Sequence, residues 1–397
     1  MKALLVTNFA SHYRAPFFER LSRVVDIEYI FFSQGTEPYW QEHLGTTPAD
    51  VRADTIVGRP VGAGLNLNPV LIRELWRRDY DVLIKCINGR LELASAYAVA
   101  KARRKPFVFW TTIWWHPVTP LGWASQPFLH GVYRGADAIL TDGDHISRFV
   151  AGHGVDPAKI FSAELSVDNE WFEQAVSNSD QKAFRASIDA VDQPLILAVS
   201  RLVGVKGLDV LVAAAADLAD LRPVVVVVGS GPLAQELEER ARRSGVDLRL
   251  LGGLPPERMP LLYAAADVYT MPSVTTPQIR EVWGAGVNEA HCQRVPVVVS
   301  DAVGAAAGGL VVHGETGLIV PERDAPALAA ALRRILVDKA YGQTLAAAGH
   351  ERVQATNYDA MVGSFVAAID YAVAAHAGDP SAAALAADRF RPPSEIG

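Results

Sequence analysis

Short runs of apolar residues alternate with amphipathic segments along most of the chain. Val224–Val228 consists of five valines, and Leu195–Val199 is equally apolar. Runs this continuous are typical of strands buried on both faces, as in parallel sheets that are covered by helices. The alternation therefore predicts an α/β fold with doubly wound parallel sheets.

The expected elements fall into two similar sets. In the first half we expect strands at residues 3–7, 27–32, 82–86, 107–111, 138–141 and 160–163, and helices at 16–24, 69–77, 91–103 and 145–151. In the second half we expect strands at residues 195–199, 224–228, 248–251, 268–271, 295–299 and 317–320, and helices at 208–218, 233–243, 259–265, 325–336 and 341–348. The repetition of strands and helices predicts two sheets of the same kind.

At 397 residues the chain is long for one hydrophobic core, so two domains are expected. Strand signals stop and the composition turns polar over residues 173–193, which predicts a linker between a first domain (1–172) and a second (194–357). Two α/β halves that meet at a linker imply a cleft, and ligands of such sheets bind beyond the carboxyl ends of the strands. Residues 378–397 are expected to form a loose tail.

Composition excludes several classes of protein. The formal net charge of -7 argues against a nucleic-acid partner. Cys86 and Cys292 are the only cysteines and lie far apart, without histidines at ligand spacing, so neither a disulfide framework nor a zinc site is expected, and a reducing compartment fits. The amino terminus lacks signal-peptide character, and no run of about 18 apolar residues predicts a membrane span. These features predict a cytoplasmic protein.

Two carboxylates give the strongest functional signal. Glu281 and Glu289 are separated by seven residues, and a glycine-rich stretch lies between them, with a helix expected to begin at about Ala285. Backbone amides in the first turn of a helix can bind an anion, and a carboxylate can accept a pair of hydroxyl hydrogen bonds from a diol. Phosphate-binding amides between two diol-binding carboxylates predict a sugar-nucleotide site.

Further motifs surround this pair in a characteristic order. Arg201 and Lys206 follow one expected strand, the turn 229–232 follows the next, and paired glycines at 252 and 253 follow a third. The order resembles that of the family-four retaining glycosyltransferases of the GT-B fold, strongly over residues 195–335 and more weakly over residues 1–168. The resemblance implies two Rossmann-like doubly wound domains facing an interdomain cleft. It also implies that a helix at residues 358–377 crosses back to the first domain.

The resemblance assigns roles to residues of the second half. Arg201 and Lys206 would stabilise a departing diphosphate without a metal, Glu281 would bind hydroxyls of the donor sugar, and Glu289 would bind the ribose. The remaining donor-binding residues would contribute mainly backbone; they are Gly229, Ser230, Gly252, Gly253, Leu254, Trp283, Gly284, Ala285, Gly286 and Val287. No protein base is expected, because the leaving phosphate would help to deprotonate the acceptor.

In the first half, the resemblance places His116 near the donor sugar. Ser11, His12 and Arg14 would form an acceptor-side loop, although the glycine pair that many family members carry there is absent. Arg90 is expected either to face an anionic group or to belong to a structural cap.

Two further patterns have structural interpretations. The sequence Asp142-Gly143-Asp144 is interpreted as a turn in which Asp144 caps a helix, and not as a metal site. The basic cluster at residues 101–105 predicts at most peripheral membrane contact. Arg294 stands where the family usually has a glycine, which predicts a local change in packing.

Three alternatives accompany the expected transfer of a sugar to a glycan, lipid-linked or small-molecule acceptor. A glycoside hydrolase also uses paired carboxylates, but it would not require Arg201, Lys206 or phosphate-binding amides. A nucleotide-sugar epimerase would need further acid–base residues. A catalytically silent nucleotide-sugar-binding subunit stays open because of the unusual loop at residues 11–14. In each case the nucleotide sugar is a ligand or substrate, and no cofactor is expected.

Overall fold

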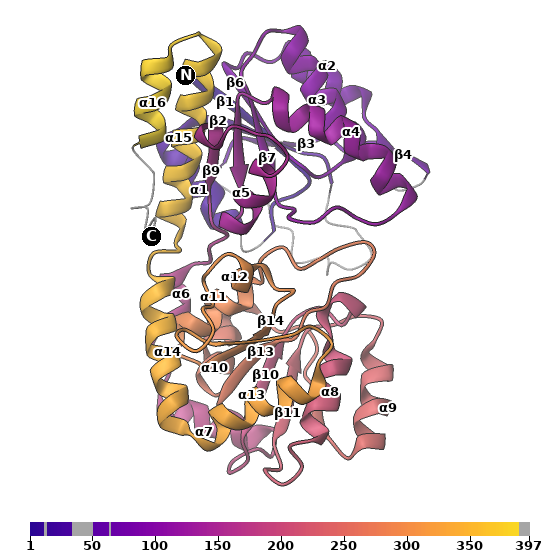
Figure 1. Cartoon of the computed structure of the whole chain (residues 1–397), viewed down its shortest axis with the longest axis vertical. Helices are drawn as coiled ribbons and strands as arrows, with labels where there is room; N and C mark the ends of the chain where they lie inside the picture. Colours follow the sequence, from indigo (N-terminus) through magenta and orange to yellow (C-terminus); the bar gives the residue numbers. More distant parts are fainter. Residues whose placement is uncertain (12–13, 34–50, 63–64, 389–397) are drawn as a thin grey trace. The chain divides into compact units, whose positions relative to one another are not determined.

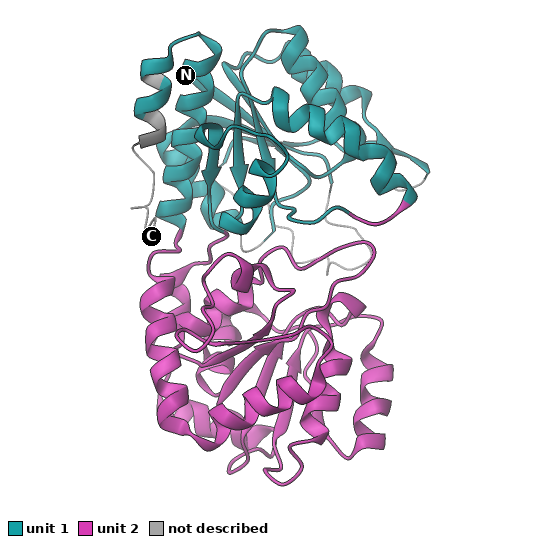
Figure 2. Ribbon diagram, viewed as in Figure 1, with its two compact units in different colours: residues 1–116, 120–164, 358–397 teal, residues 117–119, 165–357 magenta. Residues whose placement is uncertain are grey.

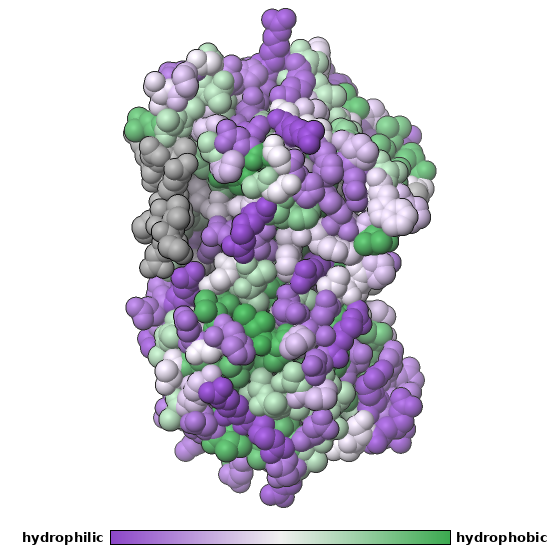
Figure 3. Space-filling view, in the orientation of Figure 1, coloured by the Kyte–Doolittle hydropathy of each residue, from purple (hydrophilic) through white to green (hydrophobic). Residues whose placement is uncertain are grey.

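The computed structural model describes residues 1–11, 14–33, 51–62 and 65–388 (Figure 1). The chain divides into two compact units (Figure 2). Unit 1 comprises residues 1–116, 120–164 and 358–397, and unit 2 comprises residues 117–119 and 165–357. On the face drawn in Figure 3, hydrophilic residues cover much of each unit, and hydrophobic residues are interspersed among them.

Unit 1 is built on a parallel sheet whose strand order is β3-β2-β1-β6-β7-β8-β9. Its strands are β1 (Lys2–Thr7), β2 (Asp26–Phe31), β3 (Ala53–Thr55), β6 (Val82–Cys86), β7 (Phe107–Thr111), β8 (Ala138–Thr141) and β9 (Ile160–Ser162). A separate antiparallel pair is formed by β4 (Arg59–Gly62) and β5 (Leu65–Leu67). Every residue of β6, β7 and β8 is buried, as the continuous apolar runs predict.

The helices of unit 1 are α1 (Ala15–Val24), α2 (Pro69–Arg77), α3 (Arg90–Ala102), α4 (Pro120–Gly135), α5 (Asp144–Ala151), η2 (Pro157–Lys159), α15 (Tyr358–His376) and α16 (Pro380–Asp388). Helix α2 begins with Pro69 in its first turn, and the side chain of Asn68 accepts a hydrogen bond from the Leu71 amide. The first turn of this helix is therefore fixed by its sequence.

Helix α15 completes the core of unit 1 from the far end of the sequence. The Phe365 ring lies 4.9 Å from that of Phe17 and 5.1 Å from that of Trp110, measured between centroids. Tyr358, Met361 and neighbouring apolar residues of α15 belong to the same buried cluster as the strands. Helix α15 therefore packs within the unit that contains the amino terminus.

Two features of this region differ from the sequence expectations. Residues 380–388 form helix α16 instead of a loose tail, because this alanine-rich segment has high helix propensity. The stretch Lys339–His376 is long and apolar enough to cross a membrane by length and composition, but 56% of its most apolar window is buried. Its apolar character matches the burial of Phe365 and its neighbours in the core.

Unit 2 contains a second parallel sheet with the order β12-β11-β10-β13-β14-β15. Its strands are β10 (Leu195–Val199), β11 (Val224–Val228), β12 (Asp247–Leu250), β13 (Val268–Met271), β14 (Val297–Ser300) and β15 (Leu318–Val320). Its helices are α6 (Asn169–Phe172), α7 (Asn178–Ser187), η3 (Gly204–Lys206), α8 (Leu208–Ala216), α9 (Ala234–Ser244), η4 (Pro256–Arg258), α10 (Met259–Ala264), α11 (Ala285–Cys292), α12 (Gly304–Ala307), α13 (Ala325–Val337) and α14 (Lys339–Val353). Both sheets are thus of the expected doubly wound, Rossmann-like type.

The boundary between the units differs from the linker expected at residues 173–193. These residues belong to unit 2, and they contain α7, which is capped by the side chain of Ser177. Phe184 of this helix is buried, and the Arg185 guanidinium lies 2.7 Å from the Asp267 carboxylate. The polar composition reflects a helix that buries one face, and the first domain ends nearer residue 164 than 172.

We expect Phe365→Ala to destabilise unit 1 by about 3–5 kcal/mol, because the substitution leaves a cavity between α15, α1 and the sheet. Urea unfolding of the full chain measures the effect. The matched control is Phe128→Ala, whose ring is 40% exposed and should cost much less. Equal small losses in both variants would mean that α15 is not part of the core.

Candidate functional site

The sheet of unit 2 has one position where the direction of winding reverses. The chain runs from β10 to β11 and β12 on one side, and it returns to place β13 on the other side of β10. Loops that leave the carboxyl ends of β10 and β13 therefore diverge to opposite sides of the sheet. Such a switch point is where open α/β sheets bind ligands.

Backbone contacts hold these two loops together. The amide of Val274, after β13, donates to the carbonyl of Val205, after β10, at 2.8 Å. Gly207 has a φ of 60°, and a Cβ atom there would lie 2.0 Å from the carbonyl oxygen of Pro272. Only glycine fits this left-handed position against neighbouring backbone. The glycine thus allows the loop that carries Lys206 to approach the loop after β13.

The side chains of Lys206 and Glu281 meet at this switch point. The Lys206 Nζ atom lies 2.5 Å from Glu281 Oε2, and the Ser273 hydroxyl donates to the same oxygen at 3.1 Å. The two charged side chains are only 11% and 15% exposed. Burial alone would raise the pKa of Glu281, but Lys206, Ser273 and the charge of Arg201 together lower it. Glu281 is therefore a carboxylate at neutral pH and neutralises Lys206.

Backbone hydrogen bonds also connect the loop after β10 to the loop after β11, and the loop after β11 to the loop after β12. The amide of Leu202 donates to the Ser230 carbonyl at 2.9 Å, and the amide of Gly229 donates to the Gly252 carbonyl at 2.8 Å. A Cβ atom on Gly229, whose φ is 137°, would lie 2.0 Å from the Ser200 carbonyl oxygen. Ser230 and Gly252 thus lie in loops that are hydrogen-bonded in a chain to the loop that carries Arg201. Gly253 and Leu254 follow in the same loop as Gly252, and a nucleoside pocket here stays a prediction.

Helix α11 begins beside these loops with an open first turn. Gly284 has a φ of 103°, and a Cβ atom there would lie 2.6 Å from the Met271 sulfur. The Val287 amide donates to the Gly284 carbonyl, whereas no described residue accepts a hydrogen bond from the amides of Ala285 and Gly286. Two amides of this turn can therefore receive an anion.

Trp283 supports the start of this helix from the interior. Its side chain is 1% exposed, and its indole donates to the Asn288 side chain at 2.8 Å. The Asn288 amide in turn donates to the Leu165 carbonyl at 3.2 Å. The Trp283 side chain is thus a structural element, and this residue can serve a donor only through its backbone.

Glu289 lies within α11, where Tyr263 donates a hydrogen bond of 2.6 Å to its carboxyl group. Burial raises the pKa of Glu289 to about 7, although the bond from Tyr263 acts in the opposite direction. Glu281 and Glu289 therefore differ in charge near neutral pH, since one is held ionised by a lysine and the other is partly protonated. A ribose-binding role for Glu289 stays a prediction.

Arg294 follows the end of the same helix and adopts a φ of 54°. This left-handed conformation explains why a glycine would suit the position. The local change that the sequence predicts at Arg294 is therefore a backbone conformation that is strained for a residue other than glycine.

In unit 1, the predicted acceptor-side residue Arg14 has an internal partner. Its guanidinium lies 3.1 Å from Asp142 and 4.5 Å from the centroid of the Trp110 ring, and the Trp110 indole also donates to Asp142 at 2.6 Å. Burial raises the pKa of Asp142 despite the charge of Arg14. Arg14 therefore fixes the loop after β1 to the loop after β8.

The interpretation of Asp144 as a helix cap is wrong. The N-cap residue of α5 is Gly143, which has no side chain, and Asp144 is the first residue of the helix. A carboxylate at this position interacts favourably with the helix dipole without acting as a cap. Asp142, which is wholly buried, is part of the Arg14 pair and not of an exposed turn.

The other predicted residues of unit 1 lie on different elements. Ser11 is buried, and its carbonyl accepts hydrogen bonds from the amides of Arg14 and Ala15. Arg90 is exposed at the start of α3, and His12 lies outside the described residues. The ring of His116 lies 5.6 Å from that of His130 and 5.3 Å from that of His153. A contact between His116 and a donor sugar stays a prediction.

Sequence reasoning missed a buried lysine at the switch point of unit 1. The Lys85 ammonium donates to the carbonyls of Cys86 and Asn88, at 2.5 and 2.6 Å. Burial lowers the pKa of Lys85 to about 8. A lysine within an otherwise apolar strand was the available signal, but its contacts are to backbone of its own loop, which favours a structural role.

Comparison with known proteins supports the assignment of unit 2. Residues 180–352 match the family model described as glycosyl transferases group 1. A GDP-mannose-dependent alpha-(1-6)-phosphatidylinositol monomannoside mannosyltransferase from Mycobacterium tuberculosis is 31% identical over 59% of this chain and 63% of the relative. A D-inositol 3-phosphate glycosyltransferase from Kribbella flavida is 32% identical over 57% of this chain and 55% of the relative. The chain thus spans less than two thirds of the length of these curated relatives.

Solved structures match a larger part of the chain. HepE from Anabaena, in complex with UDP and glucose, superposes with a TM-score of 0.74 and 18% identity over 93% of this chain and 99% of that chain. A sucrose-phosphate synthase from Thermosynechococcus elongatus has a TM-score of 0.71 and 20% identity over 92% of this chain and 97% of that chain. These similarities confirm the GT-B fold class.

Residues 180–352, less than half of the chain, thus resemble the glycosyl transferases group 1 family. The resemblance inferred from the order of its motifs is confirmed at that level.

The raised pKa of Glu289 predicts a pH dependence of stability. The folded chain binds more protons than the unfolded chain between about pH 4.5 and 7, so the contribution of Glu289 is fully present below this window and is lost as pH rises through it. From pH 5 to 7.5 we expect wild type to lose about 1–3 kcal/mol in free energy of unfolding relative to Glu289→Gln. Urea unfolding at a series of pH values measures this difference. Glu257→Gln, at an exposed site, is the control and should show the same dependence of the free energy of unfolding on pH as wild type. The same pH dependence in Glu289→Gln as in wild type would contradict the account.

Proposed function

We propose that the protein is a retaining glycosyltransferase that transfers a sugar from a nucleoside-diphosphate sugar to a glycan or glycoconjugate acceptor. The observation that carries the proposal is the ion pair of Lys206 and Glu281 at the switch point of unit 2, beside the open amides of α11. The family match over residues 180–352 and the names of the relatives support the same reaction class.

The diphosphate gains negative charge as the bond between the anomeric carbon and its oxygen breaks. Lys206, Arg201 and the amides of Ala285 and Gly286 would stabilise this charge with groups that are already oriented, and no metal is required at the diphosphate. The acceptor oxygen bonds to the anomeric carbon on the face that the phosphate leaves, and its proton passes to a phosphate oxygen. The chain then needs no separate base, and the sugar retains its configuration.

The ion pair gives Glu281 a second task. Without a donor, Glu281 supplies the negative charge that partly buried Lys206 requires. A bound diphosphate would supply that charge instead, which leaves the carboxylate to accept hydrogen bonds from hydroxyls of the donor sugar. Lys206 and Glu281 would thereby couple binding of the phosphate to binding of the sugar.

The relatives indicate which substrates to test first. The name of the mycobacterial relative specifies GDP-mannose and phosphatidylinositol monomannoside. The name of the Kribbella relative specifies D-inositol 3-phosphate and no donor. We propose GDP-mannose and inositol-containing acceptors, including lipid-linked ones, with UDP-glucose as the second donor because HepE was solved with it.

We further propose a cytoplasmic protein with at most peripheral membrane contact. Lys101 of the basic cluster lies 3.7 Å from the Asp137 carboxylate, and Arg103 donates to the carbonyls of Leu75 and Arg78. Two of the four basic residues in the cluster therefore have partners within unit 1, which favours a structural role for them.

Lys206→Ala and Arg201→Ala should each lower turnover by about a hundredfold or more, because each removes an oriented cation from the leaving group. The measurement is the release of nucleoside diphosphate from GDP-mannose or UDP-glucose in the presence of the inositol-containing acceptors. Each rate is measured once with EDTA and once with added Mg²⁺ or Mn²⁺. We expect the rates with and without the divalent ion to agree. Lys182→Ala, at an exposed part of α7, is the control; thermal unfolding verifies that the variants fold.

Wild-type turnover in either variant would contradict the assignment. Nucleotide binding without release by the wild-type chain would identify a silent binding subunit. Conversion of the donor sugar to its epimer would identify an epimerase.

The two carboxylates should respond differently to neutralisation. Glu289→Gln should weaken binding of free GDP by about 10- to 100-fold, since a charged hydrogen bond to the ribose is lost. Glu281→Gln should leave this affinity unchanged or higher, because Lys206 loses its competing partner, while turnover falls. Calorimetry with GDP on both variants tests this directly, and a loss of affinity confined to Glu281→Gln would show that the two roles are reversed.

A further inference from the structure

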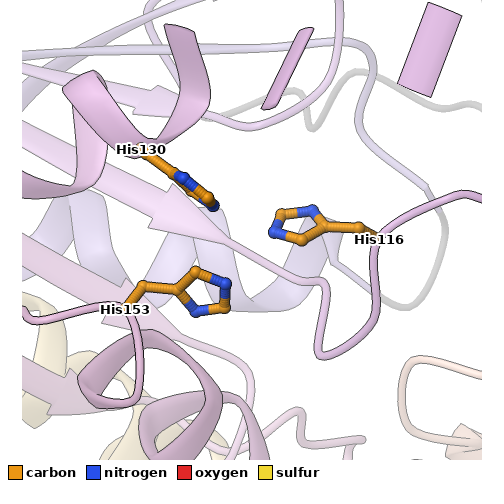
Figure 4. A group of neighbouring side chains, drawn as sticks. All are labelled: His116, His130 and His153. Atoms are coloured by element: carbon orange, nitrogen blue, oxygen red, sulfur yellow. The ribbon is translucent and has the colours of Figure 1, made fainter. Parts of the chain in front are cut away.

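Three histidines of unit 1 converge from three separate elements. His116 lies in the loop after β7, His130 lies on α4, and His153 lies in the turn after α5. Figure 4 shows the three imidazole rings facing one another. One potential ligand atom from each ring lies within 4.8 Å of the other two. The arrangement therefore brings three nitrogen donors to one point.

The hydrogen bonds of these rings leave lone pairs facing the cluster. The Nε2 atoms of His116 and His130 are buried and have no hydrogen-bond partner among the described residues. His153 donates from Nδ1 to the Phe149 carbonyl at 2.7 Å. That bond places the proton on Nδ1, so that Nε2 of His153 carries the lone pair. A carbonyl that accepts from the remote nitrogen is the usual support of a metal-binding histidine.

Burial favours the neutral form of the His116 and His130 rings. Burial, followed by the proximity of His153 and His130, lowers the pKa of His116 to about 4. The pKa of His130 is also lowered, first by burial and then by His153 and Arg134. A metal ion binds the neutral form of imidazole. Three packed imidazoles without an ion would leave two buried nitrogens unsatisfied.

We propose that His116, His130 and His153 form a site for one divalent transition-metal ion, with Zn²⁺ as its natural occupant. Imidazole ligands favour zinc and its neighbours, whereas Mg²⁺ and Ca²⁺ require oxygen ligands that the cluster lacks. Three protein ligands leave the fourth tetrahedral position for water or another ligand. Zinc–nitrogen bonds of about 2.0–2.1 Å place tetrahedral ligand atoms about 3.3 Å apart. The three ligand atoms, which lie within 4.8 Å of one another, would therefore approach by up to about 1.5 Å when an ion binds.

The ion would fix the loop after β7 to α4 and to the end of α5. It would engage His116, which the sequence resemblance had placed beside the donor sugar. This site belongs to unit 1, whereas the residues proposed to hold the diphosphate belong to unit 2. The proposed stabilisation of the diphosphate by residues of unit 2 therefore does not depend on this ion, whereas the predicted contact of His116 with the donor sugar would compete with it.

The test uses the untagged full-length chain, stripped with a chelator and dialysed against Zn²⁺ or Co²⁺ alone. We expect about one zinc per chain by elemental analysis and, for the cobalt form, the intense visible absorption of a tetrahedral ion. Saturation with zinc should raise the melting temperature by about 5–10 °C. The variants His130→Gln and His153→Gln should lose the bound ion, the cobalt spectrum and the thermal shift together.

His376→Gln, at an exposed histidine of the same unit, is the matched control and should bind one ion as wild type does. Circular dichroism of the metal-free variants distinguishes loss of ligands from loss of fold. A folded wild-type chain that retains no stoichiometric zinc would overturn the proposal. Equal zinc binding by wild type and both cluster variants would overturn it as well.

Discussion

The ion pair of Lys206 and Glu281 is the interaction on which the account depends. It connects the loops after β10 and β13, the two strands between which the sheet of unit 2 changes its direction of winding. Two partly buried charges at this place require each other in the absence of a ligand, since neither is fully hydrated. Gly207 makes the pair possible, because any side chain there would collide with the backbone of Pro272.

The buried or partly buried cations of unit 1 have partners of a different kind. Arg14 is paired with buried Asp142, and Lys85 donates to carbonyls of its own loop. These cations are already satisfied by groups inside unit 1, so they are poor candidates for binding a diphosphate. In unit 2 the amides of Ala285 and Gly286 have no acceptor among the described residues, and we propose that a bound phosphate would take the place of Glu281 beside Lys206. The contrast supports a donor site in unit 2.

Much of the fold could be predicted from the sequence because buried parallel strands have continuous apolar runs. Helix α4 was missed, since Pro127 and three glycines obscure its helical pattern. Helix α7 was missed because its polar residues resemble a linker, and the edge strand β3 has only three residues. Predictions that depended on continuous apolar runs succeeded, whereas helices that contain many polar residues, or proline and glycine, were missed.

Some features of the candidate site could likewise be predicted from the sequence, and others could not. The motif loops of unit 2 could be expected to gather, because they follow neighbouring strands at one edge of a sheet. The bond between Lys206 and Glu281 could not be predicted, since it joins residues 75 positions apart and depends on side-chain geometry. The three histidines carry no recognisable spacing, and only the packing of α4 and α5 brings them together.

A crystal structure of the chain with GDP or UDP bound tests the central claim most directly. The account predicts phosphate oxygens within hydrogen-bond distance of Lys206 Nζ and of the amides of Ala285 and Gly286. It also predicts a longer separation between Lys206 and Glu281 than the 2.5 Å seen without ligand. A nucleotide bound elsewhere, with the ion pair intact and these amides still open, would contradict it.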